Sequence, residues 1–387
     1  MKKELLKKIS SYTLKSLAFI GTTIGAVVIL LVMSILLICH GPSMSARQLF
    51  VTTVLETGQL KFLASVFLSE DEIQAMVNQN SMKPMDEDVD ISLIKVAVKQ
   101  NSNVVNSNGS TVLDGTASSA GNSGQNPPQT EDVPTTPQDP RDGIEILPIS
   151  GRTFYGTLMI IEDPSRVSVA TTYPWGEYGK NLDVIAKEAG AIAAVNGGLY
   201  ESYSNTGARP YGVAVSNGQI QLNQPGSWPG LYMIGLNNDN ILVIKNLAGM
   251  NASQFEAYVK ENGIRDAVAF QEEASDKNNH FVQLIINGEA RELNGMGSGL
   301  NPRTAIGQRA DGAILLLVTD GRGASGHLGA SASDLISVMM ENGAVNAANL
   351  DGGSSSCMYY DEEYLMTSVT FYYSNASWRL PTAFVVK

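Results

Sequence analysis

One carboxylate, Asp351, stands between a largely apolar segment and a run of glycines and serines. Residues 344–348 predict a short buried strand, and residues 349–356 continue it as NLDGGSSS. The glycines allow the backbone to turn sharply and to approach a ligand closely, and serine hydroxyls can bind a sugar or an anion. We therefore predict that Asp351 lies at the lip of a pocket. The same string is also typical of an ordinary boundary between a strand and a turn, with solvated Asp and Ser.

Three other segments end or begin strands with similar polar residues. Residues 191–195 form an apolar strand that runs into Asn196 and two glycines, and residues 313–318 form another that runs into Asp320. Arg303 begins a third apolar strand at residues 303–307. Strand ends that each carry Asn, Asp or Arg beside glycine favour one pocket lined by several of these ends.

The ordered set NGGLY (196–200), NPRTAIG (301–307), VTDGR (318–322) and NLDGGSSS (349–356) resembles the phosphodiester glycosidases. The resemblance covers roughly residues 152–387. It implies a hydrolase that cleaves the glycosyl–phosphate bond of a sugar-1-phosphodiester, and bacterial relatives link such domains to envelope or exopolysaccharide glycans. It implies no cofactor.

Chemistry on such a substrate needs a carboxylate near the anomeric carbon and cations near the phosphate. A phosphate monoester leaves as a stable anion, so positive donors aimed at it matter more than acid assistance. The fork of arginine suits that task, which favours Arg303 as phosphate clamp and Arg322 as helper. Asp351 would attack, deprotonate water or stabilise the oxocarbenium-like centre, with Asp320 as a second carboxylate. The alternative for Arg303 is a structural salt bridge with a carboxylate such as Asp351.

Further side chains and backbone groups are expected to hold sugar hydroxyls and phosphate oxygens. His327 is included because it lies in a glycine-rich loop next to a strand end, a place that often carries function. The expected substrate-binding residues are Asn196, Gly197, Gly198, Arg322, His327, Asn349, Gly352, Gly353, Ser354 and Ser355.

Three other functions remain open at this stage. A serine hydrolase using Ser354 or Ser355 would lack the usual GxSxG elbow, and Cys357 as a nucleophile would lack an evident histidine partner. A tethered carbohydrate-binding or wall-assembly module could keep the fold without turnover. The three histidines form no zinc-binding pattern, and a structural calcium among the Asp and Asn loops stays possible.

The amino-acid composition limits the kinds of molecule and the cellular setting that fit this protein. The net charge of −12 argues against nucleic acid, because no basic stripe exists to neutralise phosphates. Only two cysteines occur, Cys39 and Cys357, which excludes a disulfide framework and is typical of a bacterial envelope protein.

The N-terminus predicts a membrane anchor. Residues 17–39 are uncharged, apolar and long enough to span a bilayer as a helix. Five lysines precede them in residues 1–16, which places this basic tail in the cytoplasm and the rest of the chain outside a cell membrane. A cleaved signal peptide is the alternative, but its apolar core is usually shorter.

The remaining chain divides into a stalk, a linker and a domain. Residues 40–99 predict a membrane-proximal helical stalk, in which Ser69 and Glu72 form a capping box, and which could bind a protein partner. Residues 100–140 are rich in Ser, Asn and Pro and predict a disordered linker.

Residues 141–387 predict an α+β domain. Asn-Gly pairs at 217–218 and 287–288 predict hairpin turns. Helices are expected to begin at Asn181, at Asn251 or Ser253, and at Ser331. Hairpins outnumber helices, so we expect a mixed, largely antiparallel sheet with helices on one side.

Overall fold

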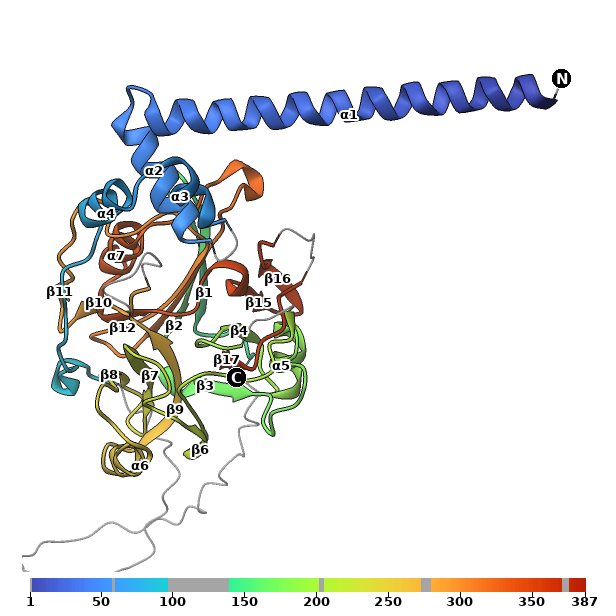
Figure 1. Ribbon diagram of the computed structural model, residues 1–387. Coiled ribbons are helices and arrows are strands. Elements are labelled where there is room, and N and C mark those ends of the chain that lie inside the picture. The colour runs from blue at the N-terminus through green and yellow to red at the C-terminus, as the bar shows by residue number, and fades with distance from the viewer. Residues whose placement is uncertain (1, 58–59, 97–138, 202–204, 273–279, 371–375) are drawn as a thin grey trace, which may run out of the picture.

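The computed structural model describes residues 2–57, 60–96, 139–201, 205–272, 280–370 and 376–387. The predicted linker, residues 100–140, lies outside the described residues except for its last two positions. The polypeptide forms a long N-terminal helix, a small helical bundle and a sheet-rich domain (Figure 1).

Three sheets build the domain, and every strand pair recorded in them is antiparallel. The seven-stranded sheet has the order β1 (Ile144–Ser150), β2 (Tyr155–Ile161), β13 (Ile314–Thr319), β12 (Arg303–Arg309), β14 (Ala344–Asn349), β10 (Gln283–Ile286), β11 (Glu289–Ala290). The second sheet has the order β16 (Glu363–Met366), β15 (Met358–Tyr360), β4 (Ala193–Asn196), β17 (Thr382–Val386), β3 (Val167–Thr171). The third has the order β6 (Gln219–Asn223), β5 (Val213–Ser216), β9 (Ile264–Gln271), β7 (Leu231–Asn237), β8 (Leu242–Asn246). This architecture confirms the α+β prediction.

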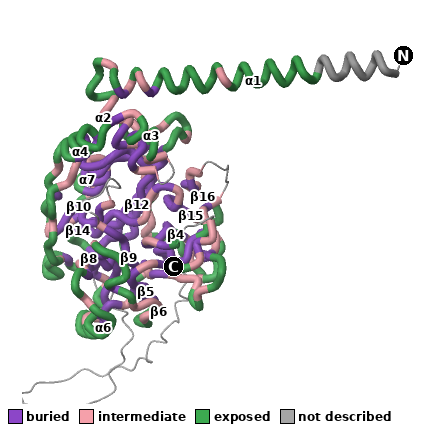
Figure 2. The backbone as a smooth tube through the Cα atoms, in the orientation of Figure 1, coloured by how far each residue is buried: buried purple, intermediate pink, exposed green. Residues whose placement is uncertain are grey.

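The three sheets enclose one central core. Met159 of β2, Val195 of β4 and Ile234 of β7 all belong to it. Their outer faces pack against different helices: α7 (Ala332–Glu341) on the first sheet, α5 (Leu182–Glu188) on the second and α6 (Ala252–Glu261) on the third. The sequence led us to expect helices on one side of a single sheet. The helices instead cover the outer faces of three different sheets. Burial on both faces explains why the central strands are continuously apolar (Figure 2).

Local sequence signals fix the turns and the helix starts. Asn217 and Gly218, with φ of 50° and 75°, join β5 to β6 as a hairpin, and Asn287 and Gly288 do the same between β10 and β11. Asn251 rather than Ser253 caps α6 in a capping box.

The N-terminal region consists of α1 (Lys2–His40), α2 (Met44–Leu55), α3 (Phe62–Phe67) and α4 (Glu70–Gln79). The capping box of Ser69 and Glu72 is present at the start of α4, as predicted. One candidate membrane span, Thr13–His40, is long and apolar enough to cross a bilayer.

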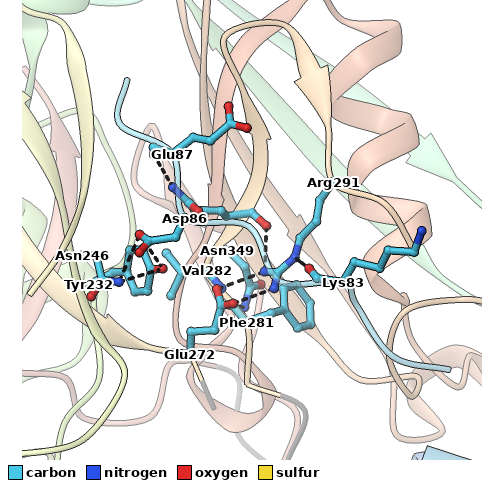
Figure 3. Close-up of polar contacts among 11 residues, drawn as sticks. Lys83, Asp86, Glu87, Tyr232, Asn246, Glu272, Phe281, Val282, Arg291 and Asn349 are labelled. Atoms are coloured by element: carbon cyan, nitrogen blue, oxygen red, sulfur yellow. Dashed lines mark hydrogen bonds and ion pairs between the residues drawn. The ribbon is translucent and has the colours of Figure 1, made fainter. Parts of the chain in front are cut away.

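The segment that follows α4 lies along the sheet domain. Lys83 N–H donates to the Glu292 carbonyl at 2.9 Å, and Arg291 Nε donates to the Lys83 carbonyl at 2.7 Å. Further along, Gln283 Nε2 donates to the Glu87 carbonyl at 2.7 Å (Figure 3). Residues 83–87, in the last part of the region predicted as a stalk, therefore pack along the domain, where they bond to groups of the β10–β11 hairpin.

Candidate active site

Antiparallel pairing brings the predicted strand ends together. β12 lies between β13 and β14, so its first residue, Arg303, sits opposite Thr319 at the end of β13. Ala305 pairs with Asn349 at the end of β14. The start of one strand and the ends of its two neighbours thus lie at the same end of the sheet, as the sequence predicts.

The side chain of Asn196 connects the second sheet to this end of the first sheet. Its Nδ2 donates to the Asp351 carbonyl at 2.6 Å, and its Oδ1 accepts from Thr304 Oγ1 at 2.7 Å and from Cys357 N–H at 3.3 Å. The side chain is fully buried. Asn196 therefore fixes the backbone of Asp351, and its amide is occupied by the protein.

Gly197 and Gly198 allow close packing behind the site. A Cβ on Gly197 would lie 2.4 Å from Thr382 Oγ1, and one on Gly198 would lie 2.2 Å from the Ala269 carbonyl oxygen. The Gly197 carbonyl also accepts the Asp351 N–H at 3.4 Å. Gly197 therefore fits closely against the neighbouring strand β17, and Gly198 fits where the second sheet meets β9 of the third sheet.

Asp351 is partly buried and follows β14 at this end of the sheet. Burial raises the pKa of its carboxyl from the usual 3.8 to about 7, although hydrogen bonds from Ser355 and from the Gly352 N–H, and the charge of Arg322, pull in the opposite direction. Ser355 in turn shares a 2.9 Å hydrogen bond with the buried Tyr200 hydroxyl. A carboxyl with a pKa near neutrality can exchange protons with a reacting group at neutral pH.

Arg322 comes from the loop after β13, where its charge acts on the Asp351 carboxyl, and this residue is exposed to solvent. Its backbone adopts φ of 54°, its Nη1 donates to Ser354 Oγ at 2.8 Å, and its Nε donates to Asn301 Oδ1 at 3.0 Å. Gly353 makes room for the guanidinium, because a Cβ there would lie 2.6 Å from Arg322 Nη2. Non-glycine residues in the left-handed region often occur at functional sites.

Arg303 is bound on all sides by the protein. Its Nη2 forms a 2.9 Å ion pair with Glu56 Oε2 and a 3.0 Å hydrogen bond with the Gly299 carbonyl, and the guanidinium lies 4.9 Å from the centre of the Phe281 ring. Both ion-pair side chains are nearly inaccessible, at 4% and 2%. The structural salt bridge considered as the alternative for Arg303 is therefore present, with Glu56 as partner in place of Asp351.

Glu56 reaches this position from the C-terminal end of α2. Its Oε1 accepts the Gly299 N–H at 3.0 Å. Burial raises the pKa of the Glu56 carboxyl, and the charge of Arg303 opposes this. No motif in the sequence pointed to Glu56, because it lies in the segment predicted as a stalk.

Asp320 and His327 bind each other. Asp320 Oδ2 lies 2.7 Å from His327 Nδ1, and Asp320 Oδ1 accepts the Tyr155 N–H at 2.8 Å. This pair therefore holds the loop that carries Arg322. Asn349 is also engaged by the fold, since its Nδ2 donates to the Phe281 carbonyl at 3.0 Å.

The geometry does not assemble a serine hydrolase triad. Ser354 Oγ accepts from Arg322, Ser355 Oγ pairs with Tyr200, and no hydrogen bond joins either serine to His327 in the described part of the chain. Cys357 is buried, and burial raises the pKa of its thiol far above the usual range. Over the same residues, no three His, Cys, Asp or Glu side chains cluster in a way that could hold a metal ion.

Together, the fold and the site define an antiparallel α+β domain with a protonatable carboxylate beside an arginine at converging strand ends. The sequence model of the phosphodiester glycosidase family matches residues 189–387, about half of the chain. The protein belongs to the phosphodiester glycosidase family.

Individual relatives are more distant or match only in part. The chain is 40% identical over 65 residues to the SPbeta prophage-derived uncharacterized protein YomE of Bacillus subtilis (strain 168), covering 17% of this chain and 10% of that protein. It thus spans about a tenth of this curated relative's length. It is similar to the zebrafish N-acetylglucosamine-1-phosphodiester alpha-N-acetylglucosaminidase catalytic domain, auto-inhibited by its pro-peptide, with 19% identity, 63% and 81% coverage of the two chains and a TM-score of 0.48. A hypothetical protein from Synechocystis gives 19% identity, 63% and 61% coverage and a TM-score of 0.40.

Proposed function

We propose that this chain is a membrane-anchored extracytoplasmic hydrolase that cleaves a sugar-1-phosphodiester in envelope or exopolysaccharide glycans. Family membership supports the reaction class. The observation that carries the proposal is Asp351, whose carboxyl has a pKa of about 7, lies next to Arg322 and is fixed through its backbone by Asn196.

In the proposed reaction, Asp351 acts as general base. Its carboxylate takes a proton from a water molecule whose oxygen attacks the anomeric carbon, and the bond from that carbon to the phosphate oxygen breaks. The products are a free sugar and a phosphate monoester. A base with a pKa near the working pH is efficient in this role, and Arg322 stabilises the charge that develops on the departing phosphate.

Arg303 is the second cation assigned to the phosphate, and the Glu56 carboxylate occupies it in this structure. A carboxylate and a phosphate oxygen use the same arginine donors. We propose that Glu56 stands in for the substrate phosphate, so that the described conformation is a closed form. Opening then requires the end of α2 to move away from Arg303.

The anchoring part of the proposal rests on α1. The candidate span Thr13–His40 has 28 residues, and it contains an 18-residue stretch with a mean hydropathy of 2.7, of which only 11% is buried by the rest of the chain. A lysine-rich tail precedes it, which favours a cytoplasmic N-terminus and an extracytoplasmic domain.

Hydrolysis assays test the proposal directly. The full chain in detergent is incubated with a panel of sugar-1-phosphodiesters, and free sugar and phosphate monoester are quantified. Turnover of at least one member that is absent with Asp351→Asn supports the hydrolase. Tight binding of the phosphodiester by the unsubstituted protein without any product contradicts it and favours a carbohydrate-binding module.

A further inference from the structure

The last two turns of α1 belong to the core of the helical bundle. Ile35 and Cys39 are buried together with Val51 of α2, Ala64 of α3 and Ile73 of α4. Only three residues, 41–43, separate α1 from α2. The bundle is therefore attached to the end of the apolar helix by packing as well as by covalent connection.

This packing sets the level of the bundle relative to a bilayer. The 28 residues of the candidate span extend ~42 Å as a helix, whereas the hydrocarbon core is about 30 Å thick. Placed at the C-terminal end of the span, this excess of roughly eight residues covers the turns that carry Ile35 and Cys39. Helix α3 packs on α1, and this placement would put it at the level of the lipid headgroups.

Large apolar side chains are exposed around this end of α1. Phe62 and Val66 are four residues apart, so they share one face of α3, and they are 56% and 64% exposed. Leu37 and Met44 are 72% and 60% exposed at the end of α1 and the start of α2. These four residues, Leu37, Met44, Phe62 and Val66, are called the apolar collar below.

Helix α4 of the same bundle differs in character. The exposed residues of α4 include Glu70, Asp71, Glu72 and Gln74, and none of the exposed positions of this helix carries a large apolar side chain. The bundle thus has a polar face on α4 and an apolar collar beside the end of α1, which is the asymmetry expected of an element seated at a membrane surface.

We propose that the apolar collar inserts into the interface of the bilayer and seats the catalytic domain on the membrane. The proposal rests on the anchoring by α1 put forward above. Four side chains form too small a patch for a stable dimer, which buries about 800 Å² per partner. A lipid interface needs no such area, because α1 already holds the bundle beside it.

Site-directed fluorescence quenching tests this inference. The full-length variants Phe62→Cys, Val66→Cys and, as a matched control on α4, Gln74→Cys are labelled with an environment-sensitive fluorophore and reconstituted in phosphatidylcholine vesicles. The two natural cysteines are both buried, and labelling of the unsubstituted protein gives their background. The labels are then compared in vesicles with and without lipids that carry a quencher near the headgroup.

Insertion predicts that the labels at positions 62 and 66 lose most of their emission to the quencher lipids, while the label at position 74 does not. Equal, weak quenching at all three positions overturns the inference. The inference is also overturned if the emission of the labels at positions 62 and 66 depends on the amount of protein per vesicle and not on the quencher lipid. A second copy of the chain would then cover the apolar collar. Hydrolysis measured in the same vesicles reports separately on the proposed reaction, and release of the chain by an alkaline wash reports on the anchor.

Discussion

Replacing Glu56 by glutamine should activate the enzyme. Glutamine keeps nearly the same shape and can still accept the Gly299 N–H, but it removes the charge that pairs with Arg303 at 2.9 Å. If Glu56 occupies the place of the substrate phosphate, the variant removes the carboxylate that competes with a phosphodiester for Arg303. KM should fall, while kcat changes little, because the substitution removes a competitor of binding and not a group that acts on the reacting bond.

The size of the effect follows from the contact that is lost. A hydrogen bond to a charged group contributes about 1.5–3 kcal/mol, and about 1.4 kcal/mol corresponds to a tenfold change in affinity. When the binding-competent form is only a fraction of the protein, the apparent affinity falls by that fraction. The expected fall in KM is therefore roughly 10- to 150-fold. Without substrate the variant should be less stable by about 3–5 kcal/mol, because Arg303 stays buried and unpaired.

Steady-state kinetics on a sugar-1-phosphodiester, with thermal unfolding alongside, measure both effects. Glu272→Gln is the matched control, since Glu272 forms another buried ion pair, with Arg291 at 2.6 Å (Figure 3). The control should lose stability without any gain in activity. A fall in activity of Glu56→Gln that exceeds that of the control would refute the closed-form proposal and leave Glu56 as a structural partner of Arg303.

Three further predictions concern the site. The pKa of Asp351 is raised to about 7 in the folded protein, so its stabilising contribution is present below about pH 4 and is lost as the pH rises through 7. Asp351→Asn should therefore be more stable than the unsubstituted protein above pH 7, by at most about 4 kcal/mol. Equal pH profiles of the melting temperature for the two proteins would contradict this. Arg322→Lys keeps the charge but loses the planar fork, so kcat/KM should fall roughly tenfold or more on a phosphodiester and much less on an aryl glycoside without phosphate; equal losses on both substrates would make Arg322 structural. Asn196→Ala should lower the free energy of unfolding by about 1–3 kcal/mol for each group that loses its partner, namely the Asp351 carbonyl, the Thr304 hydroxyl and the Cys357 N–H; unchanged denaturant unfolding would contradict that role.

Local patterns in the sequence predicted much of the fold. The Asn-Gly pair at 217–218, the capping box at Ser69 and the helix start at Ser331 act over a few residues, and all are present. The grouping of residues around Arg303 and Asp351 was also predictable, because polar residues at several strand ends converge when the strands pair antiparallel.

Other features depend on contacts between distant segments, which no local pattern records. Asn196 shows the polar-then-glycine pattern of a ligand-binding strand end, yet its amide joins two sheets. Glu56 lies at the end of α2, far from Arg303 in the sequence, and gave no sign that its carboxylate would reach Arg303. The arrangement of helices on three outer faces also depends on how the sheets pack, which hydrophobic periodicity alone does not determine.

The hydrolysis rate of Asp351→Asn tests the central claim most directly. Asparagine is nearly isosteric, so the backbone contacts of residue 351 with Asn196 and Gly197 should persist. The measurement is turnover of a saturating sugar-1-phosphodiester by both proteins, with binding of the same compound measured in parallel. The proposed mechanism predicts a fall in turnover of roughly a hundredfold or more with binding retained. Near-normal turnover by a folded Asp351→Asn protein would contradict the assignment of Asp351 as the essential base.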